Sequence, residues 1–538
     1  MSKMPKIARF GGKRDETNAL GMIVHPVVFY ASAAIIMAIV FLTVLNTKQV
    51  ESLFSTIQAG MSDRFGWLYI LAMNIFLGYV VFLGFSRYGK IRLGGPDAKP
   101  DFGVWGWFAM LFSAGMGIGL LFFGVAEPIY HYNNNPLGPD GNIQAAKDAM
   151  TLTFFHWGLH AWGVYALVGL SLAFFGFTLN LPLTIRSAFY PLIGDRVRGW
   201  MGNSIDTLAV VATLFGVATS LGLGVQQVSA GLEHIFGIEQ SSMVLMLLIA
   251  IVTGMATISV VLGLDAGIQQ LSKLNIVLAG LLMLFLLVVG PTLFLLDNFV
   301  QNIGNYLQRL PSISFWSEGL QGEDGGWQNG WTIFYWAWWI AWSPFVGMFI
   351  ARISRGRTIR EFITGVLLVP VIVSFFWLTV FGDTALYNEL FGAGTIAAAV
   401  GENIDTSIYV LFEGYPLAVV TSILAMIVVI VFFVTSSDSG SFVIDIISSG
   451  GHENPPVGQR VFWAILEGVV AAVLLVAGGL GALQTASITA GLPFTIILLL
   501  MCWSLLLGLR TEWKTRGSVY EMQADPTVDA EEPAGSRR

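Results

Sequence analysis

The stretch FGVWGWFAMLFSAGMGIGLLFFGVA, residues 102–126, carries the two features on which the predicted fold depends. It contains no charged residue, and it is longer than the roughly 20 apolar residues with which a helix crosses a bilayer. Near its middle, the run G-M-G-I-G from Gly115 to Gly119 interrupts it. Because glycine weakens a helix and leaves backbone N–H groups open to a ligand, the stretch predicts a membrane-spanning helix with a break.

Charge-free runs recur along the whole chain. They fall at 17–47, 65–86, 102–126, 149–185, 207–232, 240–264, 274–296, 325–351, 362–382, 414–437 and 468–509. Only 11% of the residues are charged and 55% are apolar, whereas a typical soluble domain carries about 25% charged residues. The last run is twice the length of one span and holds Gly478, Gly479 and Gly481 near its middle, so it predicts parts of two helices. The sequence therefore predicts an all-α membrane protein with 12 transmembrane helices.

The positions of the basic residues predict the orientation of these spans. Lys and Arg gather in cytoplasmic loops, and this bias is met when both termini are cytoplasmic. Of the 27 Lys and Arg residues, only Lys48, Arg64, Lys147 and Arg309 then lie outside. The net charge of −7 gives no sign of a nucleic-acid partner, and the single cysteine, Cys502, excludes a disulfide within the chain.

Two clusters of aromatic residues lie within predicted spans, at or next to the candidate breaks. The first is FHWGLHAWGVY at 155–165, and the second is WTIFYWAWWIAWSPF at 331–345. Any single ring of this kind is explained by a lipid-facing belt or by helix packing. Two clusters instead indicate a cage for a quaternary ammonium group, which ring faces attract by ~0.5–2 kcal/mol per contact.

The break from Gly115 to Gly119 predicts the other half of a ligand site. N–H groups freed near the N-terminus of a half-helix favour a carboxylate, so the cage and the break together describe a zwitterion. Ser343 and Pro344 are interpreted as a corresponding interruption in a second set of five helices, which is typical of inverted repeats. One alternative stays open, because Gly115 and Gly119 also have the small-xxx-small spacing of closely packed helices.

Three motifs occur together and in a fixed order. They are G-M-G-I-G-L from Gly115 with A-E-P at 126–128, W-A-W-W-x-x-W-S-P-F-V-G at 336–347 with A-R-I-S-R-G-R at 351–357, and T-S-S-D-S-G at 435–440. In these motifs the chain resembles the betaine/carnitine/choline transporters, over about Pro26 to Leu509.

This resemblance implies a leucine-transporter-like core of two inverted five-helix repeats, preceded by two extra helices, and a homotrimer in a bacterial cytoplasmic membrane. The expected segments are a cytoplasmic N-terminal tail at 1–22, two extra transmembrane helices at 23–98, a first repeat at 103–297, an extracellular connector at 298–330, a second repeat at 331–509 and a cytoplasmic C-terminal tail at 510–538. Within the connector, Asn298 to Leu310 is expected to form an amphipathic helix.

The resemblance also implies roles for individual residues. The family's aromatic box is matched by Trp157, Trp162, Tyr165 and Trp339, and its further aromatic contacts by Trp338 and Trp342. Backbone groups for the substrate are expected from Gly115, Met116, Gly117 and Gly119. The family's choline carriers have an aspartate where this chain has Gly119. Because that acid is missing, the resemblance implies a substrate with its own carboxylate, glycine betaine before choline.

Sodium is the coupling ion that the resemblance implies. Its expected ligands are the hydroxyls of Thr435 and Ser436 and the backbone carbonyls of Ser113, Met116 and Phe432. Thr213 and Phe345 match a second sodium site, but Val217 replaces a threonine there and removes one oxygen ligand. Considered without the family, serine and threonine in membrane helices more often bond back to their own helix.

The expected function is import of a zwitterionic quaternary ammonium compound, most directly glycine betaine, by sodium symport and without a cofactor. The chain contains no G-x-S-x-G or H-E-x-x-H motif, so no enzyme is predicted. The alternative left open is a proton-coupled carrier or a substrate/product exchanger for carnitine, dimethylsulfoniopropionate or choline.

Overall fold

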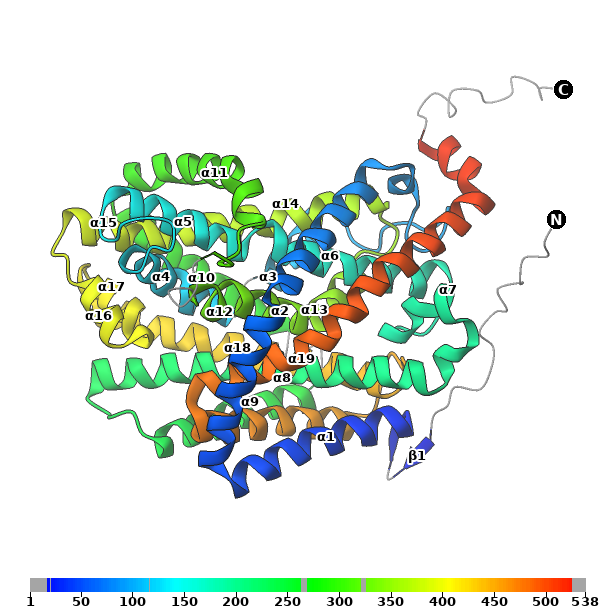
Figure 1. The fold of residues 1–538 in the computed structure, drawn as a ribbon, viewed down its shortest axis with the longest axis horizontal. Coiled ribbons are helices and arrows are strands. Elements are labelled where there is room, and N and C mark those ends of the chain that lie inside the picture. The colour runs from blue at the N-terminus through cyan, green and yellow to red at the C-terminus, as the bar shows by residue number, and fades with distance from the viewer. Residues whose placement is uncertain (1–16, 20, 116, 263–268, 321–325, 525–538) are drawn as a thin grey trace.

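The computed structural model of the chain describes residues 17–19, 21–115, 117–262, 269–320 and 326–524. These residues form a bundle of helices (Figure 1), with one antiparallel pair of short strands, β1 (Thr17–Ala19) and β2 (Met22–Val24), before the first helix. That helix begins at Pro26, a residue suited to the first helical position because its missing N–H would have no partner there. The ring of His25 caps the helix by accepting the N–H of Val28.

The first half of the chain contains ten α-helices. They are α1 (Pro26–Leu45), α2 (Thr47–Phe85), α3 (Val104–Gly115), α4 (Ile118–Asn133), α5 (Ile143–Trp157), α6 (Leu159–Ala173), α7 (Tyr190–Ile193), α8 (Trp200–Phe236), α9 (Ser242–Leu262) and α10 (Gln269–Val289). A π-helical segment, η2 (Phe174–Thr178), extends α6. Short 3-10 helices lie in the connecting segments, at η1 (Arg87–Lys90), η3 (Ile185–Phe189) and η4 (Gly194–Arg198).

The second half begins with α11 (Thr292–Ser314), which includes the segment expected to form an amphipathic helix. It lies at the edge of the bundle against α5 (Figure 1). The remaining helices are α12 (Trp327–Gly330), α13 (Thr332–Ile353), α14 (Ile359–Leu378), the π-helical η7 (Thr379–Asp383), α15 (Thr384–Phe391), α16 (Ile396–Glu402), the 3-10 helix η8 (Ile404–Thr406), α17 (Ser407–Glu413), α18 (Ala418–Ser448) and α19 (Val457–Ala524).

Within the described residues, ten helical segments are long and apolar enough to cross a membrane, against the twelve spans predicted. The difference has two physical causes. The predicted span at 102–126 is divided between α3 and α4, and each of these helices is too short to be counted alone. The 68-residue α19 joins two helices across a kink, because Gly478 and Gly479 leave the helical conformation. Gly479 has φ 59° and ψ −155°, a combination that glycine adopts without the strain of a side chain.

The helices divide into a central and a peripheral set. In the most apolar stretch of α8, 94% of the residues are buried, and the same fraction holds for the segment from α5 to η2. In α9 and α10 the buried fractions are only 28% and 22%. A helix that is apolar all round is stable where protein or lipid surrounds it. The central helices therefore pack mainly against protein, whereas α9 and α10 leave much of their apolar surface exposed on the outside of the bundle.

The interruption predicted at Pro344 was wrong, because α13 runs continuously from Thr332 to Ile353. Proline has no N–H to donate to the carbonyl four residues earlier, which here belongs to Ile340. The hydroxyl of Ser343 donates to that carbonyl instead, at 2.7 Å. The neighbouring serine thus supplies the hydrogen bond that proline removes, and the helix continues.

The central helices α6 and α13 approach closely at two glycines. A Cβ atom on Gly169 would lie 3.1 Å from the carbonyl oxygen of Gly347, and one on Gly347 would lie 2.6 Å from Val168 Cγ1. Small residues at such a crossing let two membrane helices pack with their backbones in near contact. The position of α13, and of the aromatic residues that it carries, therefore depends on these glycines.

We predict that Gly347→Ala lowers the free energy of unfolding by about 1–3 kcal/mol, the usual cost of overpacking, because the added methyl group forces α6 and α13 apart. Gly280→Ala on the peripheral α10 is the matched control, since a Cβ atom there would meet nothing within 4 Å. Thermal unfolding of the detergent-solubilised protein measures both. Equal stability of the two variants would contradict the close contact.

Candidate substrate site between α4, α6, α13 and α14

A cavity lies where α4, α5, α6, α13 and α14 meet α8. Its lining is mostly aromatic and consists of Gly117, Gly119, Trp157, Ala161, Trp162, Tyr165, Ser220, Trp338, Trp339, Trp342, Val346 and Ser374. The structure thus brings eight of the ten predicted substrate-binding residues to one cavity. Of the other two, Gly115 is the last residue of α3, and Met116 lies outside the described residues.

The aromatic rings stand edge to face around this cavity. The ring centroids of Trp157 and Trp339 are 4.9 Å apart at 68°, and those of Trp162 and Tyr165 are 5.5 Å apart at 84°. Tyr165 also meets Trp339 at 6.3 Å and 76°. Trp338 stacks on Trp339 with the centroids 4.7 Å apart. Rings in these orientations offer several π-faces to one small volume, which suits a cation without hydrogen-bond donors.

A break between α5 and α6 places the first aromatic cluster. α5 ends at Trp157 and α6 begins at Leu159, with Gly158 between them. A side chain at Gly158 would overlap the carbonyl oxygen of Phe154 and would lie 2.8 Å from the hydroxyl of Tyr306. That hydroxyl accepts the N–H of Leu159 at 3.1 Å. The charge-free run at 149–185 predicts a single span here, and its local signal of the break is a glycine between two aromatic stretches.

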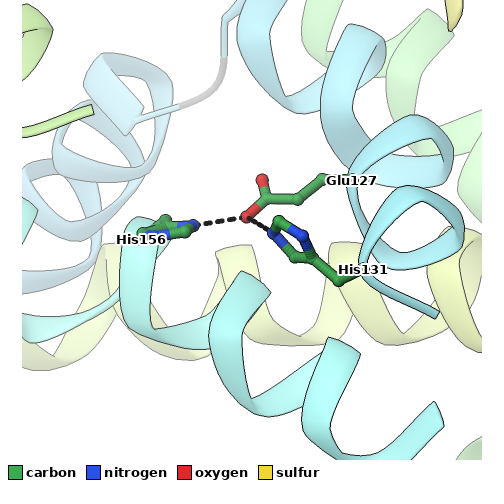
Figure 2. Close-up of side chains that lie close together, drawn as sticks. All are labelled: Glu127, His131 and His156. Atoms are coloured by element: carbon green, nitrogen blue, oxygen red, sulfur yellow. Dashed lines mark hydrogen bonds and ion pairs between the residues drawn. The ribbon is translucent and has the colours of Figure 1, made fainter. Parts of the chain in front are cut away.

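Glu127 anchors this wall of the cavity from behind. Its Oε2 accepts the indole N–H of Trp157 at 2.9 Å and the hydroxyl of Tyr335 at 2.5 Å. Its Oε1 lies 2.6 Å from Nδ1 of His156 and 3.3 Å from Nε2 of His131. Figure 2 shows both rings directed at this one oxygen. All these side chains are buried. Four donors around one carboxylate satisfy it as an anion, so Glu127 fixes the position of Trp157.

Glu127, His131 and His156 are also, among the described residues, the one group whose spacing resembles a metal site. The geometry favours a hydrogen-bond network instead. Two ligands that each bind zinc at about 2.0–2.1 Å lie farther apart than the 2.6 Å between Oε1 of Glu127 and Nδ1 of His156. His156 also bonds through Nε2 to the hydroxyl of Thr332 at 2.9 Å. Both nitrogens of this ring are therefore engaged in hydrogen bonds.

The second half of the broken helix begins at the cavity. Gly117 precedes α4 in an extended conformation, no side chain among the described residues caps this helix, and no acid lies in its first turn. The first N–H groups of a helix have no carbonyl partner inside it, so they favour an anion here. Gly119 faces the rings directly, since a Cβ atom there would lie 2.5 Å from Trp157 Cη2 and 3.0 Å from Trp338 Cη2.

The α18 half of the predicted sodium site has oxygen atoms suited to bind a cation. The hydroxyl of Thr435 donates to the carbonyls of Val431 and Phe432, at 3.1 and 3.0 Å. A hydroxyl that gives its proton to a carbonyl keeps lone pairs for a cation, so this bond is compatible with sodium. Ser436 is half-buried beside it. Ser113 lies in the last turn of α3, where carbonyls lack helical partners. Because Met116 lies outside the described residues, the ligand set is only partly described.

The predicted second sodium site is less suited to a cation. The hydroxyl of Thr213 is buried and donates to the Ala209 carbonyl at 2.7 Å, and the ring of Phe345 packs against Trp342 at 5.3 Å. Val217 turns its methyl groups toward Gly440 of α18, where a Cβ atom would meet Val217 Cγ2 at 3.0 Å. Val217 thus offers a methyl group, and no side-chain oxygen, at this place on α8.

Sequence reasoning missed four residues of the cavity lining. The missed lining residues are Ala161, Ser220, Val346 and Ser374. Ala161 and Val346 lie on the helices of the two aromatic clusters, so helical spacing could have identified them, whereas Ser220 and Ser374 carry no local signal. The position of Glu127 behind the cavity depends on how α4, α5 and α13 pack.

The chain is similar in sequence to known proteins. The family model described as "BCCT, betaine/carnitine/choline family transporter" matches residues 27–514. The chain is 49% identical over 486 residues to the glycine betaine transporter OpuD of Bacillus subtilis, covering 90% of this chain and 94% of that protein. It is 45% identical over 504 residues to a glycine betaine transporter of Acinetobacter baylyi, with 94% and 76% covered. A glycine betaine/proline/choline transporter of Vibrio parahaemolyticus is 45% identical over 509 residues, with 91% of each chain covered.

We predict that Gly119→Ala weakens ligand binding in this cavity, with glycine betaine as the probe, by about tenfold or more, because the methyl group displaces Trp157 and Trp338 at an overpacking cost of about 1–3 kcal/mol. Gly254→Ala on the peripheral α9 is the matched control, since a Cβ atom there would meet nothing within 4 Å and the residue lies outside the cavity lining. Titration of the intrinsic tryptophan fluorescence measures both. Wild-type affinity in Gly119→Ala would show that residue 119 does not border the ligand.

We further predict that Glu127→Gln destabilises the protein by roughly 2–4 kcal/mol, because an amide leaves two of the four buried donors without an acceptor. Tyr335→Phe is expected to cost less, since Glu127 then keeps three donors. Thermal unfolding gives the stability of each variant, and near-ultraviolet circular dichroism reports the setting of Trp157. A Glu127→Gln variant as stable as Tyr335→Phe would refute the anchoring role.

Proposed function

Because the chain belongs to the betaine/carnitine/choline transporter family, and is therefore a multi-pass membrane transporter and not an enzyme, we propose that it imports glycine betaine by sodium symport. The family resemblance drawn from the sequence motifs is confirmed. A betaine-type substrate follows from the family, and glycine betaine in particular is the proposal.

The observation that carries this proposal is an aromatic cavity that adjoins a helix start and has no charged group in its described lining. A permanent cation held only by rings would lack a negative partner. Glycine betaine brings its own carboxylate, and the uncapped N–H groups at the start of α4 are suited to receive it. The aromatic box of Trp157, Trp162, Tyr165 and Trp339 then receives the trimethylammonium group, at ~0.5–2 kcal/mol per ring.

The proposed architecture has twelve spans in two inverted repeats. It follows from the ten spanning segments when α19 is counted on each side of its kink and α3 with α4 is counted as one broken span. The repeats at 103–297 and 331–509 gain support from their second spans, because η2 and η7 are both π-helical. A cytoplasmic location for both termini, a bacterial cytoplasmic membrane and a trimer complete the proposal.

Sodium is proposed to bind between α18 and the end of α3. Thr435, Ser436 and the carbonyl of Phe432 would hold it from α18, and the carbonyls of Ser113 and Met116 from the other side. Oxygen-only ligation by neutral groups suits a hard cation, and the carbonyl end of α3 carries the negative end of the helix dipole. Bound sodium would link the broken helix, which also forms the substrate site, to α18.

Proton coupling is the second candidate, and two buried acids favour it. Oε2 of Glu467 accepts the hydroxyl of Ser437 at 2.8 Å, and Oδ2 of Asp438 accepts that of Ser259 at 2.6 Å. The other carboxylate oxygen of each is buried and has no hydrogen-bond partner among the described residues. Ionisable groups inside a membrane segment are functional candidates. A proton bound to the unpartnered oxygen of Glu467 or of Asp438 would remove the buried negative charge.

For the reconstituted protein we predict uphill accumulation of labelled glycine betaine under an inward sodium gradient and none when potassium replaces sodium. Thr435→Ala should raise the sodium concentration for half-maximal uptake about tenfold, the equivalent of ~1.4 kcal/mol. Thr421→Ala is the control, because this residue makes the same kind of bond to the backbone of α18 near the helix's first residue. Uptake driven by a proton gradient without sodium would contradict sodium symport and favour the second candidate.

A further inference from the structure

Ser374 places a hydroxyl in the aromatic cavity without a hydrogen-bond partner among the described residues. The residue is 2% exposed, and the surface that it keeps lines the cavity. Serine inside a helix usually donates to a carbonyl one turn earlier, as Ser171 does to the Leu167 carbonyl at 2.8 Å. Ser374 makes no such bond, so its hydroxyl is free to donate to a ligand.

The packing of α14 places this hydroxyl level with the break in the membrane helix. α4 and α14 lie side by side and run in the same direction. The indole N–H of Trp377 donates to the Leu120 carbonyl at 3.0 Å. Five residues farther along, a Cβ atom on Gly382 would meet Pro128 Cγ at 2.8 Å. Ser374 lies one turn before Trp377, and Gly117 lies one turn before Leu120. Ser374 and Gly117 therefore lie near each other, and both line the cavity.

The start of α4 and Ser374 therefore offer hydrogen-bond donors to the same part of the cavity. α4 has 16 residues, and neither a capping side chain nor an acid in its first turn occupies its N-terminus. Trp342 is a weaker candidate for this role, because its unpartnered indole nitrogen is buried away from the cavity surface. The buried serine is a second, independent feature that points to an anionic group at the helix start.

We propose that the Ser374 hydroxyl donates a hydrogen bond to the carboxylate of the bound onium compound, while the N–H groups at the start of α4 hold the other carboxylate oxygen. Ser374 is then a specificity residue. It favours trimethylammonium compounds with a carboxylate over those without one, because only the former engage its hydroxyl. This inference rests on the proposed function, since it assumes an onium carboxylate as substrate.

Ser374→Ala tests the proposal in the full-length protein. The dissociation constant for glycine betaine should rise about tenfold or more, as expected for loss of a hydrogen bond to a charged group. The inhibition constant for choline, which has no carboxylate, should change by less than about twofold. Ser171→Ala, which removes a buried hydroxyl outside the cavity, should leave both constants unchanged. Tryptophan fluorescence measures glycine betaine binding, and displacement of labelled glycine betaine measures choline.

The outcomes separate this proposal from the function on which it rests. A Ser374→Ala variant that binds glycine betaine as the wild type does would overturn the role of Ser374 and leave the transporter assignment intact. Equal losses for glycine betaine and choline would also overturn it, because they indicate a structural effect on the cavity. If the wild-type protein binds no glycine betaine, the proposed substrate is wrong and the inference fails with it.

Discussion

Inside a bilayer, backbone groups have no water to bond with, so every break in a helix must find its partners within the protein or in a ligand. This constraint explains where the candidate site lies. The break between α5 and α6 is satisfied internally, since the Tyr306 hydroxyl accepts the N–H of Leu159. At Pro344, the Ile340 carbonyl that loses its helical donor is satisfied internally as well, by the Ser343 hydroxyl. The start of α4 differs from both, because no side chain in the described part of the chain caps it and it opens onto the cavity.

The same constraint applies to the charged groups behind the cavity. A buried carboxylate is costly unless hydrogen-bond donors surround it. Glu127 has four donors, of which three lie on α5 and α13 and the fourth, His131, lies on its own helix. These bonds hold Trp157 against the cavity, so the charge lies behind the aromatic wall and stays out of the lining. A cavity with rings on one side and backbone donors on the other suits a ligand that carries both of its own charges.

Much of this arrangement could be predicted from the sequence, because composition and charge-free runs directly reflect the bilayer. The break near Gly117 and the aromatic clusters were visible as local patterns, and the structure brings them to one cavity. The positions of Glu127 and Ser374 could not be predicted, since they depend on which faces of α4, α13 and α14 meet. The interruption predicted at Pro344 was wrong for a related reason. Whether proline breaks this helix depends on a neighbouring hydroxyl, here that of Ser343. The kink at Gly479 was visible as a glycine-rich stretch, whereas its left-handed φ was not.

The central claim is that one cavity binds both charged groups of a zwitterion, the trimethylammonium group and the carboxylate. An experimental structure of the protein with bound glycine betaine tests it most directly. The account predicts density for the trimethylammonium group among Trp157, Trp162, Tyr165 and Trp339, with the carboxylate against the start of α4 beside Gly117. Ligand density outside this cavity, or a carboxylate placed among the rings, would contradict it.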